Sequence, residues 1–134
     1  MTENSASETD AISLEMLQKV YLSFHAFVAD FVGDKKAEEF ARQTYRLTGR
    51  YYRKLESLQL NGNNILNSEN EFIEDPEILG FSLWMNNFVN ELKSFMIGVG
   101  DIELDTIVGP LRNSLEKTGF FEYFQQAEEL KYSE

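Results

Sequence analysis

Cysteine is absent from this 134-residue sequence, and histidine and tryptophan occur only once each. Without cysteine, the chain can form neither disulfides nor thiolate metal sites, and it has no cysteine nucleophile. Its apolar runs fall far short of the roughly 18 residues that a membrane-spanning helix requires. The N-terminus is polar and acidic instead of basic and apolar. We therefore predict no signal peptide, no membrane span and a cytoplasmic location.

Recognisable catalytic motifs are also absent, including the Walker A loop, the dinucleotide-binding glycine motif and the Gly-x-Ser-x-Gly elbow. The single histidine, His25, excludes a di-iron bundle, which needs a histidine on each of two helices. Phosphotransfer domains place Lys and Gly shortly after the histidine, whereas here residues 26–29 are Ala, Phe, Val and Ala. We interpret His25 as a structural residue, half-buried or on a helix surface.

One acidic segment has the beginning of a calcium-loop pattern, since Asp101, Glu103 and Asp105 alternate. A calcium loop requires Gly at its sixth position and Glu at its twelfth. The chain has Thr106 and Arg112 at those positions. We therefore predict no metal ligands, no cofactor and no catalytic residues, and we expect that the protein is not an enzyme.

The net charge of −11 is distributed unevenly along the chain. Negative charge repels phosphate backbones and anionic lipids, so we expect no direct binding to nucleic acid or membranes. Seven of the twelve basic residues lie between positions 35 and 54. Helical spacing predicts one basic stripe, made of Arg42, Arg46, Arg50 and Arg53. Either this stripe is solvated and pairs with neighbouring Glu residues, or it binds an acidic partner, including the acidic half of a second copy.

Apolar periodicity predicts an all-α fold, a compact bundle of five to six helices with little or no strand. We expect a first helix over about residues 10–32 and a second that is capped by Asp34 and closed by Gly49. A third helix is expected over about residues 50–60, either separate or as a bent continuation. The Asn-rich segment 61–74 is expected to be a polar loop pinned by Ile65, Leu66, Phe72 and Ile73, and the likeliest place for a short extended piece.

The second half of the chain begins with Asp75-Pro76-Glu77, a strong helix start. This helix should run to about residue 97 and pack beside the first helix. The next should begin at Asp101 and be kinked or divided by Pro110, because proline removes an amide donor and clashes with the preceding turn. Gly119 should close it, and a final helix should cover about residues 120–130.

Two stretches share a skeleton, which is the basis for a domain prediction. Gly33-Asp34 to Thr48-Gly49 resembles Gly100-Asp101 to Thr118-Gly119, and aromatic residues follow each. We predict a disordered tail over residues 1–9 and one domain over 10–134. Its halves, about 10–60 and 75–131, are candidates for a duplicated helical unit.

The surplus of aromatics, with eleven Phe and six Tyr, suggests either a Phe-rich core or a partner surface. Our leading hypothesis is a non-enzymatic, regulatory protein-interaction module that acts through a protein partner or as a homodimer. One alternative is a small-molecule sensor with an apolar pocket between the long helices. That pocket would be lined by Phe24, Tyr51, Trp84, Phe88 and Phe95. The other alternative is an acidic nucleic-acid mimic that inhibits a basic enzyme.

Overall fold

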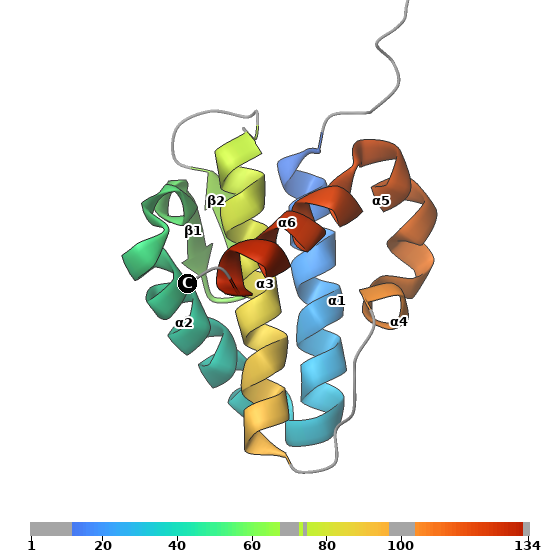
Figure 1. Ribbon diagram of the computed structural model, residues 1–134. Helices are drawn as coiled ribbons and strands as arrows, with labels where there is room; N and C mark the ends of the chain where they lie inside the picture. The colour runs from blue at the N-terminus through green and yellow to red at the C-terminus, as the bar shows by residue number, and fades with distance from the viewer. Residues whose placement is uncertain (1–11, 68–72, 74, 97–103, 133–134) are drawn as a thin grey trace, which may run out of the picture.

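The computed structural model describes residues 12–67, 73, 75–96 and 104–132, and within these ranges it confirms the predicted all-α fold class. Helices α1 (Leu14–Val32), α2 (Asp34–Tyr51) and α3 (Asp75–Phe95) stand as three columns in Figure 1. Helix α6 (Phe120–Tyr132) crosses in front of α3. Among the described residues, no helix is both long and apolar enough to cross a membrane.

Helix α1 begins at Leu14, four residues later than the predicted start near position 10. Ser13 sets this boundary because its side chain accepts a hydrogen bond from the backbone N–H of Met16. At the other end, Gly33 adopts φ 90° and its N–H donates to the carbonyl of Ala29 at 2.8 Å. Glycine ends α1 as predicted, since other residues rarely adopt a positive φ.

Two boundary predictions for α2 were wrong. Asp34 is the first helical residue and does not act as the cap; the cap position is held by Gly33, which has no side chain to accept a hydrogen bond. Gly49 does not close the helix but lies buried inside it, and the helix continues to Tyr51. The N–H of Tyr52 still donates to the carbonyl of Thr48, at 2.8 Å.

The predicted third helix over residues 50–60 is replaced by a short 3₁₀ helix, η2 (Arg53–Ser57), and the strand β1 (Leu58–Asn61). Close approach to α3 explains this, because Leu55 is fully buried and its Cα lies 3.3 Å from where a Cβ on Gly80 would stand. Burial of η2 against this glycine therefore overrides local helix propensity.

Strand β1 pairs antiparallel with β2 (Asn64–Asn67), so the extended piece starts earlier than the predicted loop 61–74. The two-residue turn places Gly62 first, at φ 64°, as in type II′ hairpin turns. Ile65 is buried as predicted, and Ile73 packs partly buried against the core. Leu66 does not pin the loop, since it is 44% exposed. Phe72 lies outside the described residues.

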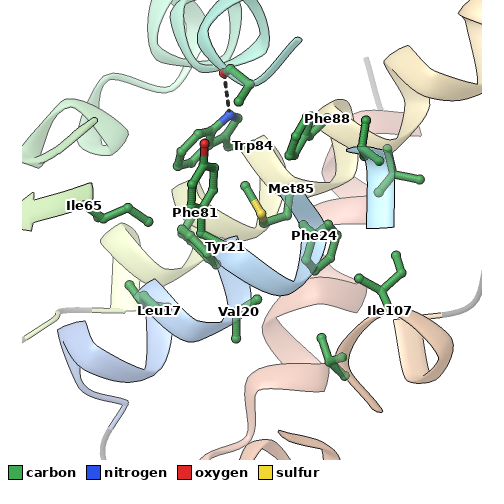
Figure 2. Packing of buried hydrophobic residues seen from close by; sticks show 14 of the residues in the cluster. Leu17, Val20, Tyr21, Phe24, Ile65, Phe81, Trp84, Met85, Phe88 and Ile107 are labelled. Atoms are coloured by element: carbon green, nitrogen blue, oxygen red, sulfur yellow. Dashed lines mark hydrogen bonds between the residues drawn. The ribbon is translucent and has the colours of Figure 1, made fainter. Parts of the chain in front are cut away.

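Helix α3 is the centre of the bundle, because it packs against α1, α2, η2 and α6. Trp84 lies fully buried on it, and its indole Nε1 donates to the carbonyl of Ala41 in α2 at 3.0 Å. Figure 2 shows Trp84 beside Tyr21 of α1, with the two rings stacked at 5.2 Å between centroids. As predicted, the two long helices α1 and α3 lie side by side.

In the C-terminal part, the helices divide and end at the residues predicted from the sequence. Gly109-Pro110 divides the helical segment into α4 (Leu104–Val108), η3 (Gly109–Leu111) and α5 (Arg112–Thr118). Gly119 ends α5 in the left-handed conformation, with φ 77° and ψ 14°. The predicted cap at Asp101 lies outside the described residues.

Candidate functional site

The five residues predicted to line an apolar pocket do not come together. Phe24, Trp84 and Phe88 are fully buried core residues, whereas Tyr51 and Phe95 are 52% and 55% exposed. The space between α1 and α3 is filled by stacked rings, since Tyr21 contacts both Trp84 and Phe88. This part of the molecule is therefore packed core.

Phe95 lies at the exposed end of α3, where it forms a small aromatic contact with α2. Its ring meets Phe40 edge-on, at 5.4 Å between centroids. The Nζ atom of Lys36 lies 5.5 Å from the Phe95 ring centroid, close enough for a cation–π contact. Phe95 thus binds to α2 from the surface and does not face α1.

The predicted basic stripe is present over the length of α2 but not beyond it. Arg42, Arg46 and Arg50 are exposed and four residues apart, while Arg53 lies past the helix end in η2. Arg42 pairs with Glu38 at 3.6 Å, and Arg53 pairs with Glu56 at 3.5 Å. Both pairs are exposed and contribute little to stability. Within the described residues, Arg46 and Arg50 form no ion pair.

An open groove of about 420 Å³ lies next to this stripe, between α2 and α3. Leu47 and Tyr51 stand on its α2 side, and each is 52% exposed. Tyr51 was predicted to line a pocket between the two long helices, but it lies at this exposed edge instead. Eight residues line the groove: Thr44, Leu47, Arg50, Tyr51, Asn87, Asn90, Glu91 and Ser94. The groove therefore combines exposed apolar surface, amide groups, one arginine on its α2 side and one glutamate on its α3 side.

Hydrogen bonds fix the floor of this groove. The Nδ2 group of Asn87 donates to the hydroxyl of Thr48 at 2.9 Å and to the hydroxyl of Tyr51 at 2.7 Å. The Thr48 hydroxyl in turn donates to the carbonyl of Thr44 at 2.6 Å. Tyr51 is thus held in place although half of it is exposed, and a partner would meet a preformed surface.

Sequence reasoning missed the α3 side of the groove, which consists of Asn87, Asn90, Glu91 and Ser94. A signal was present, because these polar residues recur at helical spacing within a helix that is otherwise apolar. The apolar face of this segment does not by itself indicate what the polar edge adjoins.

A second cleft of about 420 Å³ lies where α3 and α6 begin and includes Tyr52, Asp75 and Tyr123. The Tyr123 hydroxyl donates to Oδ1 of Asp75 at 2.7 Å. Burial, followed by this hydrogen bond and the Asp75 charge, raises the pKa of Tyr123 to about 12. Tyr123 therefore stays protonated near neutral pH and acts there as a hydrogen-bond donor.

His25 is more buried than predicted, with 8% of its surface exposed. Across the described ranges, no group of three His, Asp or Glu side chains could hold a metal ion. No protein-family model, curated protein or solved structure matches the chain.

Proposed function

We propose that this protein is a non-enzymatic interaction module whose α2–α3 groove binds an acidic, partly apolar segment of a partner protein. The single observation that carries the proposal is the exposure of Leu47 and Tyr51 beside Arg50 in a preformed groove. Apolar anchors next to a basic rim favour a segment that carries an apolar side chain flanked by Asp or Glu.

Charge complementarity supports this choice of partner. The segment from Arg42 to Lys54 contains five basic residues and no acidic one, in a chain whose net charge is −11. The acidic surface of a partner would be repelled by most of this acidic molecule, but it would be attracted to the segment from Arg42 to Lys54. An amphipathic helix laid into the groove would bury Leu47 and Tyr51 and place its acidic residues near Arg46 and Arg50.

The alternative functions lack a comparable observation. The sensor hypothesis depended on a pocket whose five predicted lining residues do not come together. The acidic-mimic hypothesis stays a prediction, based on net charge alone.

Site-specific photo-crosslinking in the host cell tests the proposal. A photoreactive amino acid would replace Leu47 in one variant and Leu22 of α1 in a matched control, because these leucines are 52% and 45% exposed. We expect position 47 to cross-link to one defined protein through a segment rich in Asp and Glu, and position 22 to give no such product. Mass spectrometry would identify the cross-linked peptides.

A charge-reversal variant makes the test sharper. R46E/R50E should reduce the cross-link at position 47 several-fold, whereas K19E/K117E, which makes an equal change in net charge elsewhere, should not. Equal products at positions 47 and 22, or a cross-link that survives R46E/R50E, would contradict the proposal. Cross-links between two copies of the chain would show that the partner is a second copy and not a different protein.

A further inference from the structure

The two walls of the α2–α3 groove carry opposite charges. Arg50 lines the α2 side, and its guanidinium group can only donate hydrogen bonds. Glu91 lines the α3 side, and its carboxylate accepts them. Within the described part of the chain, neither side chain forms an ion pair or a hydrogen bond, with the other or with any third residue. Both charges are therefore available to a molecule that lies in the groove.

Two amides extend the acceptor character of the α3 wall. Asn87 donates from Nδ2 to two hydroxyls of α2, and Asn90 donates from Nδ2 to Oδ1 of Asn86 at 2.8 Å. These bonds orient both amides and leave the Oδ1 atoms of Asn87 and Asn90 without a donor among the described residues. Together with Glu91, they place three acceptors on one side of α3, since residues three and four positions apart are neighbours on a helix.

An acidic partner segment fits only one of these walls. Its carboxylates would be attracted to Arg50 on the α2 side, but on the α3 side they would meet the Glu91 carboxylate and two amide oxygens. Covering these acceptors without giving them donors is unfavourable, because each of them loses its hydrogen bonds to water. A segment that fills the groove therefore needs hydrogen-bond donors on the side that faces α3.

We propose that the groove selects a partner segment with two differently charged sides, and that Glu91 binds a Lys or Arg side chain of this segment. The inference rests on the proposed function, because it concerns the same groove. In an amphipathic helix anchored on Leu47 and Tyr51, acidic residues would face Arg50, and a basic residue on the opposite flank would donate to Glu91. Reversing such a helix would place like charges against each other on both walls, so the groove also sets its direction.

Charge reversal at position 91 separates this proposal from simple attraction of an acidic partner. E91K removes a negative charge from the groove and adds a positive one. If the groove only attracts acidic residues, this change would strengthen binding. If Glu91 binds a basic residue of the partner, the same change would weaken binding. The two explanations therefore predict effects of opposite sign.

The assay is the cross-link formed in the host cell by a photoreactive amino acid at position 47. We expect E91K to reduce the yield of this product about tenfold, and E91Q to reduce it about two- to fivefold. The matched control is E129K, which makes the same charge change at an exposed site near the end of α6. E129K should not lower the yield. Circular dichroism of each purified variant checks the fold, and E91Q, which keeps the size of the side chain, gives a second measurement at the same position.

A charge swap between the two proteins completes the test. Mass spectrometry should find a Lys or Arg within one helical turn of the cross-linked residue of the partner. Replacing that residue with Glu should restore the cross-link to E91K. The proposal would be overturned by an equal or higher yield in E91K, or by an equal loss in E91K and E129K, although the groove would still bind its partner. A parent protein that gives no product at position 47 would instead overturn the proposed function itself.

Discussion

Replacing Gly49 and Gly119 with alanine should change stability in opposite directions, although both glycines follow a threonine in the two similar stretches. Gly49 lies in the last turns of α2, where a Cβ would meet only the Glu56 side chain, at 3.5 Å from Cγ. That distance is an ordinary van der Waals contact. Gly119 has φ 77° and ψ 14°, the left-handed region that disfavours a Cβ.

The expected magnitudes follow from these two backbone conformations. Alanine in a helix is more favourable than glycine by about 0.5–1 kcal/mol, so G49A should stabilise the fold by up to that amount. Alanine in the left-handed region costs about 1–2 kcal/mol. Part of that cost is offset because alanine also restricts the unfolded chain, which leaves a loss of about 1 kcal/mol for G119A. The two variants should therefore differ by about 2 kcal/mol.

Urea denaturation provides the assay, because Trp84 is the single tryptophan and is fully buried. Its fluorescence, together with far-UV circular dichroism, should report one transition for each variant. The urea concentration at the midpoint should rise for G49A and fall for G119A. In thermal denaturation, the melting temperatures of the two variants should lie about 8 °C apart. A change of the same sign in both variants would refute the assigned backbone conformations.

Three further predictions concern the core and the response to pH. W84F should lower the free energy of unfolding by about 2 kcal/mol in urea titrations, since it leaves a cavity and removes the hydrogen bond to Ala41. G80A should destabilise the fold by about 1–3 kcal/mol in the same assay, despite its better helix propensity, because the new Cβ would lie 3.0 Å from the Tyr52 ring. The folded-state pKa of Tyr21 is raised from 10.0 to about 12. The contribution of the protonated Tyr21 hydroxyl to the free energy of unfolding is therefore complete below pH 10 and is lost as pH rises towards 12. Between pH 8 and 11, unfolding free energies should therefore fall less in Y21F than in the wild type, by about 1.4 kcal/mol, and an equal fall in both would contradict the raised pKa.

Apolar periodicity and the positions of glycine and proline predicted those elements whose structure depends only on neighbouring residues in the chain. The apolar stripes of α1 and α3 specify helices whatever packs against them, and Leu17, Phe24, Trp84 and Phe88 are indeed fully buried. Gly109-Pro110 divides its segment because proline lacks the amide donor that a helix requires. Such features require no knowledge of the rest of the chain.

The proposed duplication shows where local similarity stops being informative. Thr48-Gly49 continues a helix, whereas Thr118-Gly119 ends one. Glycine permits either outcome, and packing decides between them. In the first stretch, the chain ends its helix only after Tyr51 and then approaches α3 at Gly80, a contact between residues far apart in the sequence.

The candidate groove was missed because periodicity does not say which edge of an apolar stripe is covered. Thr44 and Thr48 are buried under α3, while Leu47 and Tyr51, three residues further along in each case, lie just beyond its edge. All four positions belong to the same broad helical face in the sequence. Only the placement of α3 separates covered from uncovered residues.

A cleft lined by His25, Asp34, Lys35, Glu38 and Asn63 depends still more on long-range structure. In sequence, His25 adjoins the apolar stripe of α1, and that position alone indicates a structural residue. Its burial agrees with that interpretation, but an Nε2 without a hydrogen-bond partner in the described residues does not follow from it. The cleft forms only because Gln18 and Tyr21 hold Asn63 by hydrogen bonds and α2 brings Asp34 and Glu38 to the same place. A cleft assembled from three separate segments leaves no spacing pattern in the sequence.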